Sequence, residues 1–184
     1  MKNMTVANKI LFAFSILLIA FIAFGVFAYH SVRELDDLNT GINQRTTLVA
    51  TSNRVAQAMQ KTRLYIFYQV VSTDPAQKQD FAQKIQDARQ DVEDAFNALR
   101  EAKKNTDFGS PDITKQALSE LDAEQELWEN YKRMSQAGDA MKKADNREEA
   151  ETFILSPELV KAFDAAVAGI NQDAQNCIKD AAAQ

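Results

Sequence analysis

Residues 74–105 read DPAQKQDFAQKIQDARQDVEDAFNALREAKKN, and they decide the fold because they hold both a helix start and a continuous apolar stripe. Pro75 suits a first helical position, where its missing N–H would have no intrahelical partner. Asp74 can accept a hydrogen bond from the first turn. Apolar residues then recur at spacings of four and three, the seam pattern of antiparallel helical bundles. They are Phe81, Ile85, Ala88, Val92, Ala95, Leu99 and Ala102.

The same start signal occurs at two later places, and each is followed by its own apolar stripe. Ser110-Pro111 and Ser156-Pro157 repeat the arrangement of a capping residue before a proline. The stripe after residue 157 is regular and comprises Val160, Phe163, Val167, Ile170, Ala174, Cys177 and Ala181. The stripe after residue 111 is looser and comprises Ile113, Leu118, Leu121, Leu127, Trp128, Tyr131 and Met134. We expect a turn over residues 105–110 and a short helical stretch over residues 147–155.

A further long helix is predicted before residue 74, and an apolar segment leads into it. Its looser stripe comprises Leu35, Leu38, Ile42, Val49, Met59, Ile66 and Val70. Residues 10–29, ILFAFSILLIAFIAFGVFAY, carry no charge, and a helix of that length spans the roughly 30 Å hydrocarbon layer of a membrane. Lys2 and Lys9 precede the segment and all 26 acidic residues follow it. The positive-inside rule therefore places the N-terminus in the cytoplasm and the remainder outside. A cleaved signal peptide ending near residues 26–28 is the alternative.

The composition supports a helical protein and disfavours an enzyme. The 184 residues include only 5 Gly and 3 Pro, too few turn residues for a sandwich, a barrel or a nucleotide-binding βαβ unit. One histidine (His30) and one cysteine (Cys177) cannot build a multi-histidine or thiolate metal site. Cys177 is either a small core residue or the source of an intermolecular disulfide. Since no basic run could follow phosphates, we expect no nucleic-acid partner, and no catalytic residue or cofactor is indicated.

Polar residues that interrupt the stripes are the candidate ligand-binding residues. Arg45 and Arg63 continue the apolar registers of the first helix, so both are expected to face a helix–helix or subunit interface. A guanidinium there needs a carboxylate partner. That carboxylate is either a protein group, for which Glu124 is a candidate, or part of a ligand. Trp128 and Tyr131 are either core aromatics or groups that pack against a ligand.

Together these features resemble the sensor region of bacterial methyl-accepting chemotaxis receptors. Residues 63–65 (RLY) leading into 72–76 (STDPA) resemble the end of the first bundle helix and its turn. Residues 98–106 (ALREAKKNT) resemble the second helix and the following loop. Residues 137–139 (AGD) and 159–164 (LVKAFD) resemble the passage from the third helix to the fourth. The resemblance covers essentially the whole chain.

The resemblance implies a homodimer that binds a small molecule near the subunit interface, in some members through arginines of the first helix. Arg63 and Arg45 are the residues whose register fits that role. In the family the fourth helix continues into a second membrane helix, a HAMP relay and a cytoplasmic signalling hairpin. We expect this chain to be a receptor fragment or a sensor without those parts. Chemotaxis kinase control, a histidine kinase and a cyclase are the alternative outputs.

We therefore predict an all-α chain whose N-terminal transmembrane helix continues into an antiparallel, up-down four-helix bundle. Residues 1–9 form the cytoplasmic N-terminus, residues 10–29 the transmembrane helix and residues 30–184 a periplasmic sensor domain at the bacterial inner membrane. The expected partners are the membrane, a second copy of the chain and a small molecule, with carboxylates as a candidate class. The alternative is a membrane-anchored structural or protein-interaction bundle without a small ligand.

Overall fold

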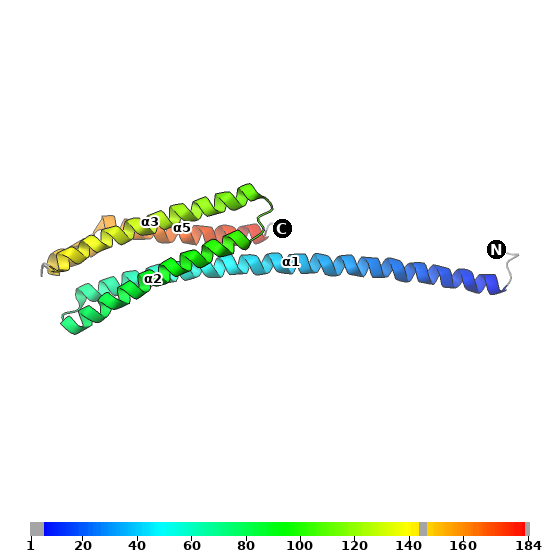
Figure 1. The fold of residues 1–184 in the computed structure, drawn as a ribbon, viewed down its shortest axis with the longest axis horizontal. Helices are drawn as coiled ribbons and strands as arrows, with labels where there is room; N and C mark the ends of the chain where they lie inside the picture. The colour runs from blue at the N-terminus through cyan, green and yellow to red at the C-terminus, as the bar shows by residue number, and fades with distance from the viewer. Residues whose placement is uncertain (1–5, 144–146, 183–184) are drawn as a thin grey trace. The chain divides into compact units, whose positions relative to one another are not determined.

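The computed structural model describes residues 6–143 and 147–182, and nearly all of them are helical. The helices are α1 (Val6–Val71), α2 (Pro75–Asn105), α3 (Pro111–Lys143), α4 (Arg147–Ile154) and α5 (Pro157–Ala182) (Figure 1). No strand occurs in these two described ranges. The predicted all-α class is confirmed. The turn before residue 111 and the short helix before residue 157 are also where the sequence places them.

The chain divides into two compact units, residues 1–42 and residues 43–184. The described part of the first unit belongs to α1, and its apolar side chains are exposed. Phe21, Phe24 and Phe27 each leave 68–69% of their surface uncovered. Phenyl groups in such number are unfavourable in water and favourable in lipid. By length and composition, α1 is the one candidate membrane-spanning helix within the described residues.

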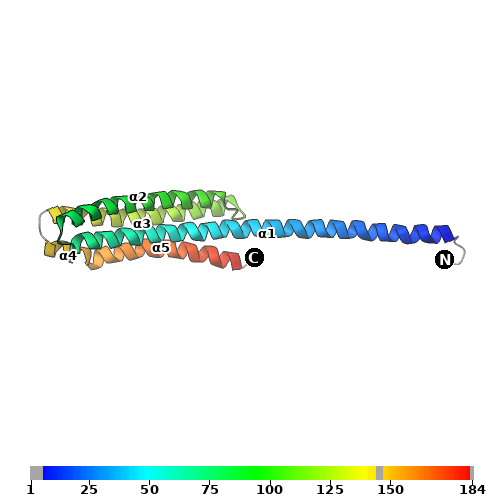
Figure 2. The ribbon, with the colours of Figure 1, turned by 90° about the horizontal axis from the view of Figure 1, so that it is seen from below.

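The second unit is a bundle of four long helices, formed by α1 from Asn43 onward, α2, α3 and α5 (Figure 2). The contacts show that neighbouring helices are antiparallel, because residue numbers rise along one helix as they fall along the other. Between α2 and α3, Arg89 contacts Ser135 and Arg100 contacts Asp122. Between α1 and α5, two such contacts are Ser52–Asp173 and Arg63–Asp164. The up-down arrangement therefore follows from short connections between long helices.

Each predicted helix start has the hydrogen bond that its sequence suggests. Asp74 accepts a hydrogen bond from the backbone N–H of Ala76 at 2.9 Å. The hydroxyl oxygens of Ser110 and Ser156 each accept one from the backbone three residues later, at 3.3 Å. These bonds satisfy N–H groups that would otherwise have no partner within the helix. The turn between α2 and α3 contains Gly109 at a φ of +80°, a backbone conformation that favours glycine.

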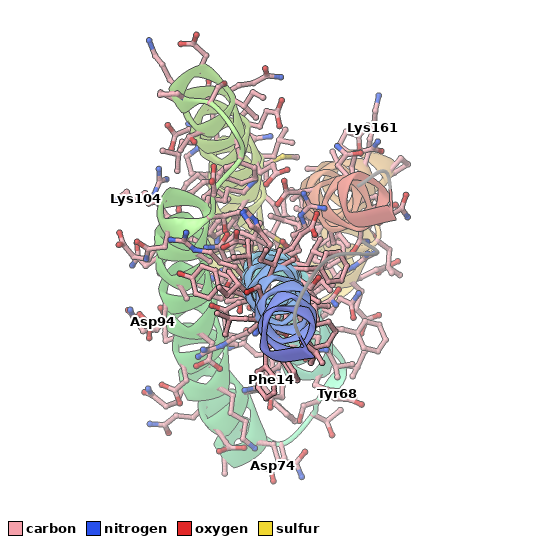
Figure 3. All side chains as sticks on the ribbon, turned by 90° about the vertical axis from the view of Figure 1, so that its right-hand side faces the viewer. Phe14, Tyr68, Asp74, Asp94, Lys104 and Lys161 are labelled. Carbon is pink, nitrogen blue, oxygen red and sulfur yellow. The ribbon has the colours of Figure 1, made fainter. Side chains whose placement is uncertain are left out.

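The predicted seam of α2 forms the centre of the bundle core. Ala88, Val92, Ala95 and Leu99 are fully buried. Val92, Ala95 and Leu99 belong to one core cluster with residues that other helices contribute, among them Met59, Leu121, Trp128, Phe163 and Ile170. Most charged side chains of the described residues lie on the outside, as Figure 3 shows for Asp94, Lys104 and Lys161. The side chain of Cys177 lies outside the described residues.

Two of the predicted stripes are wrong in part. Leu35, Leu38 and Ile42 of α1 are 52–66% exposed, and all three belong to the first unit rather than to the bundle. In α3, Ile113 and Leu127 are also exposed, at 50% and 39%. The buried seam of α3 instead runs through Leu121, Trp128, Tyr131 and Ser135. A helix of this length has more apolar residues than one packed face can cover, so the sequence alone overstates the stripe.

Candidate functional site

Three of the four predicted ligand-binding residues come together around Phe163. The guanidinium carbon of Arg63 on α1 lies 4.5 Å from the centre of the Phe163 ring on α5. The rings of Tyr131 and Phe163 meet edge to face, with centres 5.1 Å apart. The centres of Trp128 and Tyr131, both on α3, are 5.4 Å apart. We call this group, with Asp164, the Arg63 cluster.

Arg63 is partly accessible, and its ionic partner is a surface residue. Its Nη1 lies 3.4 Å from Oδ1 of Asp164, and the two side chains are 37% and 64% exposed. An exposed ion pair at this distance contributes little stability, typically 0–1 kcal/mol. The prediction that Arg63 has a carboxylate partner is confirmed, but that partner is not Glu124. The guanidinium is thus held by a ring beneath it and remains open to an anion from solvent.

Trp128 and Tyr131 are core aromatics in this structure. Their exposed fractions are 0% and 2%. Burial raises the pKa of Tyr131 to about 12, although the charges of Arg63 and Arg89 act in the opposite direction. The phenol therefore stays neutral near neutral pH. These two residues support the ring under Arg63 rather than presenting their own faces to solvent.

Arg45 is not part of the Arg63 cluster. It is half-buried on α1, five helical turns before Arg63, which corresponds to roughly 27 Å along the axis. One small molecule could not touch both arginines of the same chain. The role of Arg45 in ligand binding stays a prediction.

A buried polar layer, which the sequence analysis missed, crosses the bundle at another level along the helices, where Ser52 of α1 contacts Asp173 of α5. It contains one residue from each long helix: Ser52 (α1), Lys103 (α2), Glu124 (α3) and Asp173 (α5). Lys103 Nζ lies 2.6 Å from Asp173 Oδ1, and the two side chains are only 2% and 8% exposed. The hydroxyl of Ser52 donates a hydrogen bond of 3.3 Å to Asp173 Oδ2. Burial is the main cause that raises the pKa of Glu124 to about 7.

A second buried polar contact joins α2 and α3. Arg89 is 6% exposed, and its Nη2 donates a hydrogen bond of 3.0 Å to the hydroxyl of Ser135. Periodicity could have identified both buried cations of α2. Arg89 follows Ile85 by four residues, and Lys103 follows Leu99 by four, so each occupies a position that the apolar stripe also reaches. A charged residue in register with a core seam is the signal.

The groups of the two sites can bind an anion and a proton. Among the residues that the structure describes, no three His, Cys, Asp or Glu side chains gather as a metal site. The Arg63 cluster offers one accessible cation above an aromatic face, which can bind an anion. The polar layer offers the half-buried carboxyl group of Glu124, whose raised pKa lets it bind or release a proton near neutral pH.

The chain thus combines a long apolar helix, a candidate membrane span, with an antiparallel four-helix bundle that has charged side chains in its interior. The model of the family "four helix bundle sensory module for signal transduction" matches residues 3–183. The chain therefore belongs to this family, which is the sensory module of methyl-accepting chemotaxis proteins. No curated protein and no solved structure matches the chain. The family is one of signal transduction and not a family of enzymes.

Proposed function

We propose that this chain is the extracytoplasmic, ligand-sensing part of a chemoreceptor-like protein, anchored in the bacterial inner membrane and acting as a homodimer. Membership of the sensory-module family supports the signalling role. The charge-free segment 10–29, with basic residues before it and all acidic residues after it, supports the anchor and its orientation.

The accessible guanidinium of Arg63 is the observation that carries the ligand proposal. Among the described residues its ion-pair partner is Asp164, which is itself 64% exposed. The carboxylate of a small molecule can replace Asp164 as the partner, and it can accept two parallel N–H bonds from the guanidinium. Phe163 holds the guanidinium from below at 4.5 Å. The proposed ligand is therefore a small organic anion. An aromatic acid can also stack on the exposed face of the guanidinium.

Ligand binding would act by shifting a balance between two packings of the bundle. Arg63 lies on α1, which also contains the candidate membrane span, and Asp164 lies on α5. An anion that takes the place of Asp164 changes the contacts between these two helices. The shift is limited by the difference in affinity of the ligand for the two packings.

Thermal unfolding of the full chain in detergent micelles tests the proposal. The chain would be screened against organic acids, amino acids and aromatic acids. A ligand at 100 times its Kd stabilises the fold by about 2.7 kcal/mol. We expect Arg63→Ala to abolish that stabilisation. Arg54→Ala, an exposed arginine on the same helix, is the matched control and should preserve it.

The other outcomes separate the proposal from its alternatives. A ligand that still stabilises the Arg63→Ala variant would retain the sensor and remove the Arg63 site. Failure of every acid to stabilise the chain at several protein concentrations would favour the structural or protein-interaction bundle.

A further inference from the structure

The polar layer contains an imbalance of charge that the anion site does not explain. Lys103 and Asp173 form a buried ion pair at 2.6 Å, so their charges compensate each other. The hydroxyl of Ser52 donates a hydrogen bond to the second carboxylate oxygen of Asp173. Glu124 brings a second carboxyl group to the layer, and among the described residues Lys103 is the one cation that acts on it. If Glu124 is ionised, the layer has a net charge of −1.

The surroundings of Glu124 give that charge little compensation. Its Oε2 is buried and has no hydrogen-bond partner among the described residues. Its chain lies against Gly169 of α5, where an added Cβ would be 3.2 Å from Cγ of Glu124 and 3.8 Å from Oε1. A side chain at position 169 would therefore press on Glu124 and require it to shift by a few tenths of an ångström, so glycine gives Glu124 the space it has here. A buried, unpaired carboxylate is costly, and a protonated carboxyl group avoids that cost.

We propose that Glu124 is a proton-binding site through which the polar layer couples the packing of α3 against α5 to external pH. In the protonated state the layer is neutral, and Glu124 stays in the space that Gly169 provides. In the ionised state the carboxylate lowers its free energy by moving toward water. This movement loosens the contact between α3 and α5. The ligand of this site is the proton itself, so the inference does not depend on a small-molecule ligand.

The electrostatic groups around Glu124 support a transition near neutral pH. Burial is the largest cause that raises its pKa, and the negative charges of Asp173 on α5 and Glu120 on α3 act in the same direction. Lys103 on α2 opposes them. On α1, the described contact with the layer is that of Ser52, whose uncharged hydroxyl donates to Asp173. The pKa is raised from 4.5 to about 7.

The sign of the pH dependence follows from this direction. An unfolded chain releases the proton of Glu124 near pH 4.5, whereas the folded chain holds it until about pH 7. The contribution of Glu124 to stability is therefore lost as pH rises through this interval and stays constant above it. The direction is opposite to that of a carboxylate held in a favourable ion pair.

The first test is the thermal midpoint of the full chain in detergent micelles, measured from pH 4.5 to 8.5. We expect the midpoint of the unmodified chain to fall relative to that of Glu124→Gln as pH rises to about 7. Glu126→Gln removes an exposed carboxylate from the same helix and should follow the unmodified chain. Parallel curves for Glu124→Gln and the unmodified chain would overturn the proposal. If Glu124→Gln does not fold, a ¹³C NMR titration of the Glu124 carboxyl carbon in the unmodified chain replaces this comparison. A titration midpoint below pH 5 would overturn the proposal.

The second test concerns the packing of the two helices. Spin labels would be placed at Ala123 of α3 and Gln172 of α5, both exposed, in a chain with Cys177→Ser. We expect the distance distribution between the labels to change between pH 5.5 and 8.5, and to stay constant when Glu124→Gln is added. A constant distribution in both chains would overturn the coupling to packing. Neither test contains an organic acid, so a failure here leaves the Arg63 proposal standing.

Discussion

At the scale of single residues, the bundle differs from an apolar four-helix core by its buried charges. Lys103 and Asp173 are 2% and 8% exposed, and ion pairs so deeply buried add little stability compared with apolar residues of the same shape. Removing one partner lowers stability strongly, because the other charge is then left buried without compensation. The pair is therefore sensitive to the loss of either partner although it adds little stability when intact.

Lys103→Ala should show this asymmetry. Loss of the ammonium leaves the buried side chain of Asp173 without its cation, so we expect the free energy of unfolding to fall by about 3–5 kcal/mol. Lys104→Ala changes the next residue, whose ammonium forms an exposed pair with Glu101, and should cost less than about 1 kcal/mol. Denaturant unfolding followed by circular dichroism measures both. Equal losses in the two variants would show that burial of the Lys103 pair has no energetic consequence.

At the scale of the helices, the positions of the starts are encoded locally, so the sequence predicts them. Each start has a capping residue before a proline, and each capping side chain accepts a hydrogen bond in the structure. The stripe of α2 is equally local. Which helices become neighbours, and which faces they turn toward one another, does not depend on local sequence. The sequence therefore identifies Arg63 as a residue that needs a carboxylate, but it does not identify Asp164 in place of Glu124.

The same limit explains the polar layer. Its four members lie on four helices, and no spacing within one helix shows that they meet. Ser52 is in register with the stripe of α1, and Lys103 is in register with that of α2. The periodicity of the sequence can therefore identify these two positions. The meeting of Lys103 with Asp173 depends on how α2 and α5 face each other, which only the folded bundle determines.

Asp74→Ala tests the local encoding at a helix start. The substitution leaves the backbone N–H of Ala76 without its acceptor at 2.9 Å. We expect a loss of about 1 kcal/mol in the free energy of unfolding. Gln79→Ala, an exposed position in the second turn of α2, serves as the control and should stay within about 0.5 kcal/mol. If the two variants unfold alike, the cap contributes nothing to the bundle, and tertiary packing alone sets the start of α2.

At the scale of the whole molecule, the proposed function requires that the membrane separates the N-terminus from the bundle. The distribution of charge provides the physical basis, because Lys2 and Lys9 lie before the apolar segment and every acidic residue lies after it.

Single cysteines in a Cys177→Ser chain report on this arrangement. Asn97→Cys places the thiol at an exposed position of α2, and Asn8→Cys places it in the predicted cytoplasmic segment. In spheroplasts, a membrane-impermeant maleimide should label Asn97→Cys and leave Asn8→Cys unlabelled until the membrane is lysed. Labelling in the reverse order would put the bundle in the cytoplasm, where the Arg63 cluster and the polar layer would face intracellular anions and intracellular pH. An intact mass that includes residues 1–29 would further distinguish a retained anchor from a cleaved signal peptide.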